Sequence, residues 1–152
     1  MDFTVQNASE DLLSQIEQIE QACFSMPWTR AQLAAQLDPD RHIFLAAVQD
    51  GKVLGYVGMM YVLDEGYIAN VAVAPEARRQ GVGRALIAAL LSRAETMGLA
   101  FVTLEVRPSN TAAIALYSAF GFESVGRRKK YYDKPSEDAL LMTKYRKEGS
   151  PC

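Results

Sequence analysis

The residues best suited to bind an anion form a short turn rich in glycine and arginine. Residues 78–84 read Arg-Arg-Gln-Gly-Val-Gly-Arg and stand between a predicted strand and a predicted helix. Glycine lets the backbone turn without a Cβ, so consecutive N–H groups and the positive end of the helix dipole can converge on a pyrophosphate. A glycine pair at such a turn also has a purely structural interpretation, but three arginines at the helix start favour an anion site.

The residues around the turn separate it from two other nucleotide-binding motifs. A P-loop requires Gly-Lys followed by Ser or Thr, which is absent here. A Rossmann fingerprint requires Gly or Ala three residues after Gly83, where this chain has Leu86, and the preceding strands do not form a βαβ unit. The remaining pattern is Arg/Gln-x-x-Gly-x-Gly.

Two other side chains have the chemistry of a base and an acid. In the predicted strand 100–107, apolar residues alternate with polar ones, so Glu105 projects from the less apolar face. Tyr117 lies on the following predicted helix, and a phenol with a reference pKa of ~10 keeps its proton at neutral pH. From spacing alone, Glu105 is more often a solvated or ion-paired carboxylate and Tyr117 more often a core tyrosine, so spacing assigns neither residue a catalytic role.

The elements that must position these residues follow from periodicity and turn signals. Leu12, Ile16 and Ile19 have helical spacing, and Asp50-Gly51 separates two apolar runs as a hairpin turn does. The predicted strands cover residues 3–6, 43–48, 53–62, 66–73, 100–107, 122–126 and 139–144, and the predicted helices cover 10–24, 29–37, 82–97 and 110–121. This order predicts an α/β (α+β) fold with a mixed, mostly antiparallel central sheet flanked by helices.

Length and composition set further expectations. A chain of 152 residues that is 49% hydrophobic fits one domain, here residues 1–147, followed by a flexible tail at 148–152. A net charge of -2 gives no global attraction to nucleic acid or an anionic membrane, and neither a signal segment nor a membrane span is apparent. Cys23 and Cys152 form no disulfide framework or zinc-ligand spacing, so we expect a cytoplasmic protein without a metal. The oligomeric state stays open.

Three segments together resemble the GNAT acetyltransferases. These are the glycine turn, Asn-Val-Ala-Val-Ala-Pro at 70–75, and the stretch from Leu-Glu-Val-Arg-Pro-Ser-Asn at 104–110 to Ala-Leu-Tyr-Ser-Ala-Phe-Gly-Phe at 115–122. The resemblance implies the GNAT fold and acetyl-coenzyme A (acetyl-CoA) as co-substrate. It also implies cofactor contacts at Val71, Ala72, Val73, Arg79, Gln80, Gly81, Val82, Gly83, Arg84 and Asn110.

The same resemblance assigns roles to the two acid–base candidates. The family's general base occupies the place of Glu105 in Leu-Glu-Val-Arg, and its general acid occupies the place of Tyr117. Asn110 is also a good helix N-cap, which is compatible with a cofactor contact. His42, the only histidine, receives no role, and residues 127–130 are interpreted as a solvated basic stretch beside acidic residues around Glu137.

Further features narrow the resemblance to the RimI-type ribosomal-protein-alanine N-acetyltransferases. They are Phe-Ser-Met-Pro-Trp at 24–28, Tyr131-Tyr132, and Glu-Asp-Ala at 137–139. The implied acceptor is the N-terminal alanine of a small-subunit ribosomal protein, with Tyr131 and Tyr132 lining its site from a loop after Lys130. Two alternatives stay open: a GNAT enzyme acting on lysine side chains or a small amine, and a non-catalytic acyl-coenzyme A-binding module.

Overall fold

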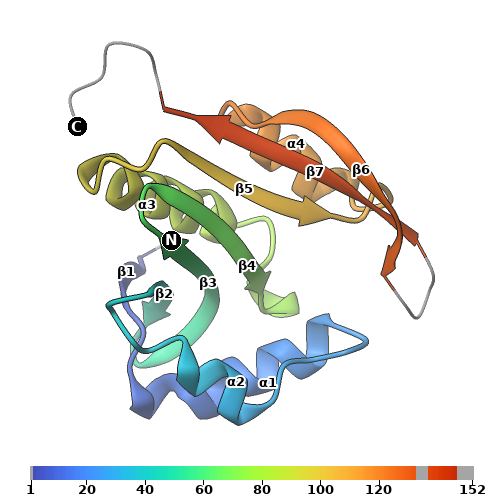
Figure 1. Ribbon diagram of the computed structural model, residues 1–152. Coiled ribbons are helices and arrows are strands. Elements are labelled where there is room, and N and C mark those ends of the chain that lie inside the picture. The colour runs from blue at the N-terminus through green and yellow to red at the C-terminus, as the bar shows by residue number, and fades with distance from the viewer. Residues whose placement is uncertain (1, 133–136, 147–152) are drawn as a thin grey trace.

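A seven-stranded sheet with helices on both faces forms the framework of the molecule (Figure 1). The computed structural model describes residues 2–132 and 137–146, and the predicted tail at 148–152 lies outside them. The strands are β1 (Thr4–Asn7), β2 (His42–Gln49), β3 (Lys52–Val62), β4 (Glu65–Val73), β5 (Phe101–Val106), β6 (Glu123–Tyr132) and β7 (Glu137–Tyr145). The helices are α1 (Leu13–Cys23), α2 (Arg30–Ala35), α3 (Val82–Thr96) and α4 (Thr111–Ala119), with 3-10 turns at Glu10–Leu12 and Pro75–Ala77.

The spatial order of the strands is β1-β2-β3-β4-β5-β7-β6. Only β4 and β5 pair in parallel among the described strands, and the other neighbours are antiparallel. The predicted mixed, mostly antiparallel sheet is therefore confirmed. No helix in the described part of the chain has the length and apolarity needed to cross a membrane.

Local turn and cap signals are confirmed where the sequence predicted them. Asp50 and Gly51 both have positive φ, 50° and 80°, as a two-residue hairpin turn requires. Asn110 caps α4 by accepting a hydrogen bond from the Ala113 N–H at 3.1 Å, and Gly121 follows the helix with a φ of 92°.

The predicted end of β6 at Gly126 is wrong, because the strand continues to Tyr132. Arg127 pairs with Leu140, and Arg128 pairs with Ala139. β6 is an edge strand, where charged side chains are tolerated and discourage pairing with other chains. Tyr131 and Tyr132 consequently end a strand, whereas the sequence predicted a loop.

The central irregularity is the place where β4 and β5 stop pairing. Their parallel ladder runs from Glu65 opposite Phe101 to Ile68 opposite Leu104 and then ends. Beside this point the β3–β4 register shifts and leaves Ala69 as an extra residue in β4. A bulge bends a strand and increases its twist, so the two strands diverge, as Figure 1 shows. We call this divergence the splay.

A buried carboxylate ties α1 to β4 at the splay. The Glu20 side chain is 1% exposed and accepts hydrogen bonds from the Tyr56 hydroxyl, the Asn70 amide at 3.1 Å and the Trp28 N–H at 2.9 Å. Asn70 directly follows the bulged Ala69. Because a buried charge is tolerated only when it is well partnered, this cluster fixes both the strand after the bulge and the segment that leads into α2.

We expect Tyr56→Phe to lower the free energy of unfolding by about 1–3 kcal/mol, because Glu20 loses a donor inside the protein. Urea denaturation measures the change. Tyr61→Phe is the matched control, since its hydroxyl bonds the Pro39 carbonyl near the surface and its loss should cost less than about 1 kcal/mol. Equal losses in the two variants would contradict a special role for the buried cluster.

Candidate active site

Glu105 lies on β5 one residue beyond the last β4–β5 pair. Val102, Leu104 and Val106 point into the core, which leaves Glu105 on the opposite face with a side chain only 9% exposed. Its Oε1 accepts a hydrogen bond from the Tyr67 hydroxyl at 3.2 Å and lies 3.6 Å from Arg128 Nη2. Its Oε2 is buried and makes no hydrogen bond to any described residue. The carboxylate thus keeps one oxygen able to accept a proton.

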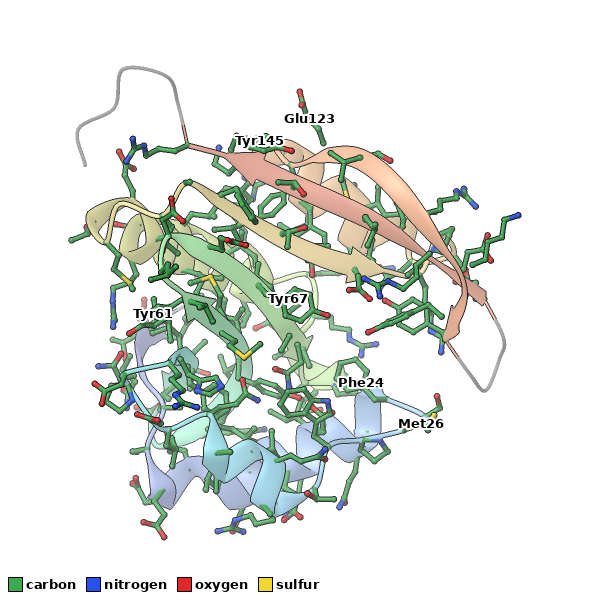
Figure 2. The ribbon with its side chains drawn as sticks, in the orientation of Figure 1. Phe24, Met26, Tyr61, Tyr67, Glu123 and Tyr145 are labelled. Carbon is green, nitrogen blue, oxygen red and sulfur yellow. The ribbon has the colours of Figure 1, made fainter. Side chains whose placement is uncertain are left out.

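The sequence did not predict the two partners of Glu105. Tyr67, labelled in Figure 2, is placed by the parallel pairing of β4 with β5. In that pairing it stands opposite Thr103. No local pattern reveals that pairing. Arg128 belongs to the stretch interpreted as solvated, yet its guanidinium reaches Glu105 and lies 5.2 Å from the centre of the Tyr131 ring. The nearby pairing of Arg127 with Asp138 at 3.7 Å does follow the predicted charge neutralisation.

Tyr131 and Tyr132 end β6 close enough to Glu105 for its charge to act on both phenols. Their ring centroids are 5.1 Å apart at 80°, an edge-to-face contact that regular strand neighbours do not make. The register shift between Arg128 and Tyr132 allows it. Burial first, and then the charge of Glu105, raise the pKa of Tyr132 to about 12. Burial first, and then the nearby Glu105, also raise the pKa of Tyr131.

Tyr117 lies on α4 and is 5% exposed, with its ring 5.7 Å from Phe122. Burial raises the pKa of its phenol to about 12, so the group carries its proton at neutral pH. Tyr117 also contributes to the raised pKa of Tyr132, which places both phenols within electrostatic reach of each other. The region around Glu105 therefore combines a carboxylate with phenols able to donate a proton.

The glycine turn leads into α3 with the backbone geometry that an anion site requires. Gly81 is the N-cap with a φ of 82°, and Arg79 also has a positive φ of 64°. The N–H groups of Val82, Gly83 and Arg84 lack partners four residues earlier in the helix, and the helix dipole adds positive potential there. The Arg84 guanidinium lies 5.6 Å from the centre of the Phe120 ring, at the end of α4.

Gly83 connects this turn with the open edge of β4. A Cβ at Gly83 would lie 3.4 Å from the Leu116 side chain on α4 and 3.7 Å from the Val73 side chain on β4. Among the described residues, the predicted cofactor residues Val71, Ala72 and Val73 have a strand partner only in β3, because the β5 ladder has ended. The glycine turn and this edge of β4 are therefore neighbours, whereas Asn110 lies at the start of α4 and caps that helix.

Arg78 belongs to the glycine turn but is not among the predicted cofactor contacts. Its Nε donates to the Val73 carbonyl and its Nη2 to Cys23 Sγ, both at 3.4 Å. Arg78 therefore links the glycine turn to the end of β4 and to α1. The remaining arginine of the turn, Arg79, is exposed.

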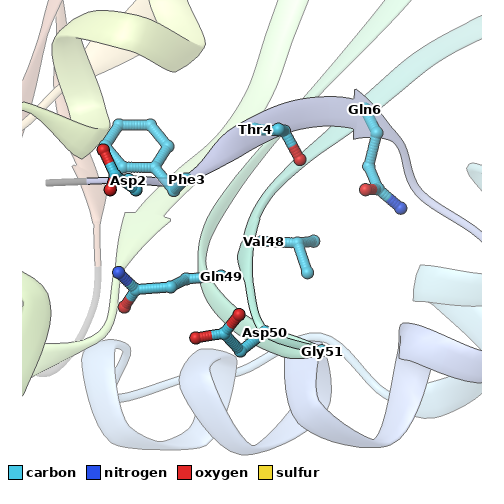
Figure 3. Close-up of a pocket in the computed structure, with 8 residues that line it drawn as sticks. All are labelled: Asp2, Phe3, Thr4, Gln6, Val48, Gln49, Asp50 and Gly51. Atoms are coloured by element: carbon cyan, nitrogen blue, oxygen red, sulfur yellow. The ribbon is translucent and has the colours of Figure 1, made fainter.

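A separate hollow lies away from these residues, beside β1 and the β2–β3 turn (Figure 3). It measures about 520 Å³ and is lined by residues of 2–6 and 48–51, none of them a predicted site residue. Within residues 2–132 and 137–146, no three His, Cys, Asp or Glu side chains gather closely enough to hold a metal ion.

This chain is similar in sequence and in structure to known acetyltransferases. The model of the acetyltransferase (GNAT) family matches residues 13–122. The ribosomal protein bS18-alanine N-acetyltransferase of Escherichia coli (strain K12) is 40% identical over 126 residues, which cover 82% of this chain and 84% of that protein. The crystal structure of the ribosomal-protein-S18-alanine N-acetyltransferase from Escherichia coli aligns with a TM-score of 0.88 and 34% identity, over 99% of this chain and 100% of that one.

A more distant structure shares the fold. Arabidopsis thaliana NAA60 in complex with acetyl-CoA aligns with a TM-score of 0.86 at 21% identity, over 95% of this chain and 98% of that one. The family model covers most of the chain, and the bacterial relative is similar along most of its length. The chain therefore belongs to the GNAT family of acetyltransferases.

Proposed function

We propose that this protein transfers an acetyl group from acetyl-CoA to the N-terminal α-amine of a protein. The observation that carries the proposal is the buried Glu105 carboxylate, with one oxygen free, at the place where β4 and β5 separate. The names of the bacterial relatives favour the N-terminal alanine of a small-subunit ribosomal protein as the acceptor. Such an acceptor implies a cytoplasmic location.

The proposed position of acetyl-CoA follows from the anion turn and the open strand edge. Its pyrophosphate binds the N–H groups at the start of α3 and the charge of Arg79. Its pantetheine arm passes Gly83 and lies along β4 from Val71 through Ala72 to Val73. The backbone groups of Val71 and Val73 point away from β3 toward the splay, because Ala72 and Ala74 hold the alternating positions that bond to β3. This path directs the thioester toward Glu105.

The acceptor is proposed to approach between the two tyrosines of β6 and the segment after α1. Phe24 and Met26 in that segment are 37% and 59% exposed, and Figure 2 shows both side chains. The segment is held in place because the Trp28 N–H bonds the buried Glu20. Exposed apolar side chains on a fixed segment suit contact with the terminal residue of a polypeptide.

The proposed reaction is direct transfer within a ternary complex. A protein α-amine has a pKa of ~7.7–8.0, so part of the acceptor amine is already neutral near neutral pH. Glu105 removes the proton from the protonated part, directly or through water. The neutral amine attacks the thioester carbonyl, the C–N bond forms and the C–S bond breaks. Tyr117 donates its proton to the leaving thiolate, and the second proton of the attacking nitrogen passes to the Tyr117 phenolate, directly or through water. The first proton, held by Glu105, passes to solvent.

We expect Gly83→Val to weaken acetyl-CoA binding about 10-fold or more, because the branched side chain fills the space between α3, Leu116 and Val73. Isothermal titration calorimetry measures the affinity, and circular dichroism checks the fold. Gly126→Val on β6 is the matched control, since its Cβ meets only Leu141 at 3.7 Å. Unchanged affinity in a folded Gly83→Val protein would refute the proposed position of the cofactor.

Glu105→Gln and Tyr117→Phe should each lower kcat by about 10²- to 10⁴-fold at neutral pH. The loss in Glu105→Gln should shrink as the pH rises above the α-amine pKa, because more amine is then already neutral. The loss in Tyr117→Phe should persist, since its proton goes to the thiolate. Glu123→Gln, at an exposed position on β6, is the control and should behave like wild type. Wild-type rates in both site variants would disprove the roles.

The α-amine assignment is tested with matched peptides, one with a free N-terminal alanine and one with a blocked terminus and an internal lysine. Mass spectrometry locates the acetyl group, and we expect strong preference for the free terminus. Tyr132→Ala should raise the KM for the peptide more than it changes acetyl-CoA affinity. Preference for the blocked lysine peptide would favour a lysine acetyltransferase, and acetyl-CoA binding without turnover would favour a non-catalytic module.

A further inference from the structure

The sheet face that carries Glu105 continues uncovered toward the beginning of β4 and β5. Cross-strand partners share a face of a sheet. Two rows of cross-strand partners therefore lie on this face of β3, β4 and β5. The first row is Met60, Tyr67 and Thr103, and the second row is Val62, Glu65 and Phe101. These six side chains line a groove of about 150 Å³. We call it the row groove.

The row groove is continuous with the site around Glu105. Tyr67 lines it and donates its hydroxyl hydrogen to Glu105 at 3.2 Å. Thr103 precedes Glu105 by two residues on β5, so both side chains lie on the same face. Phe101 lies a further two residues away, about 13 Å from Glu105 at the rise of a strand.

Large apolar side chains are exposed in and beside the row groove. Val62 is 64% exposed and Met60 41% exposed. Tyr145 on β7, with its ring 6.2 Å from that of Phe101, is 58% exposed and extends the apolar surface. Covering such side chains is favourable by about 25 cal/mol per Å², and contiguous apolar surface beside a reaction site is typical of a binding surface. Glu65 adds a carboxylate to one side of the groove.

We propose that the row groove binds the acceptor polypeptide downstream of the reacting amine, and so selects an apolar side chain a few residues after the terminus. This inference rests on the proposed function. An extended chain advances ~3.3–3.6 Å per residue, so an acceptor whose amine lies at Glu105 reaches Phe101 at about its fourth residue. That residue packs on Val62, Met60 and Phe101, and a cationic residue next to it meets Glu65.

The test measures steady-state kinetics on peptide amides of the form Ala-Ala-Ala-X-Arg, with X as Phe, Leu or Ser, and on versions with X moved one position either way. Arginine supplies the cation without an amine that can be acetylated. For wild type, the KM should be lowest with Phe or Leu at one of these positions. Val62→Ser should raise that KM about 5- to 10-fold, while the KM of the Ser peptides and the affinity for acetyl-CoA stay unchanged.

Val125→Ser provides the matched control, because Val125 is also an exposed strand valine, 51% exposed, and does not line the groove. It should leave every KM unchanged. Equal KM values for all X at each position, or an apolar preference that Val62→Ser leaves intact, would overturn the groove assignment while α-amine acetylation stands. Failure of wild type to acetylate any of these amines would overturn the proposed function and this inference with it.

Sedimentation velocity on wild type and Val62→Ser tests whether a second copy of this chain, and not the acceptor, occupies the groove. We expect the same oligomeric state for both proteins. Dissociation of an oligomer by Val62→Ser, with every peptide KM unchanged, would assign the surface to contact between copies of this chain and overturn the proposal.

Discussion

The early end of the β4–β5 ladder is the constraint on which the rest of the structure depends. Beyond Ile68 and Leu104 the two strands separate, so the outer edge of residues 71–73 has no strand partner among the described residues. Unpaired backbone groups in a sheet are costly unless a ligand or water satisfies them. The bulge at Ala69 and the buried partners of Glu20 maintain the separation. The proposed cofactor path uses that free edge, and Glu105 stands at its beginning.

A second set of contacts holds the other side of the site. Glu137 at the start of β7 accepts hydrogen bonds from the Ser109 N–H at 2.8 Å and the Ser109 hydroxyl at 2.9 Å, and it pairs with Arg107 at 3.4 Å. The Ser109 N–H is the main reason that the pKa of Glu137 is lowered. The Arg107 guanidinium also lies 4.4 Å from the centre of the Tyr132 ring. The β6–β7 strands are thereby fixed to the segment between β5 and α4, which carries the predicted cofactor residue Asn110.

The sequence predicted what depends on neighbouring residues along the chain. The Asp50-Gly51 hairpin, the Asn110 cap and the glycine turn each have local chemistry that allows only a few conformations, and all three were found where predicted. Tyr67 and Arg128 were missed because their contacts with Glu105 depend on strand registers between distant segments. The end of β6 was misplaced because charged residues predict exposure equally well in a loop and on an edge strand. The roles of Glu105 and Tyr117 came from family resemblance, since their spacing alone left both open.

Acetyl-CoA is proposed to lie from the glycine turn along the free edge of β4 to the splay. Backbone amide NMR of the ¹⁵N-labelled protein during titration with acetyl-CoA tests it most directly. We expect the amide signals of Val71, Val73, Val82 and Gly83 to shift and saturate together, while those of Thr4 and Gln49 beside the separate hollow stay in place. Shifts confined to the hollow, with the amides of β4 and the start of α3 unchanged, would contradict it.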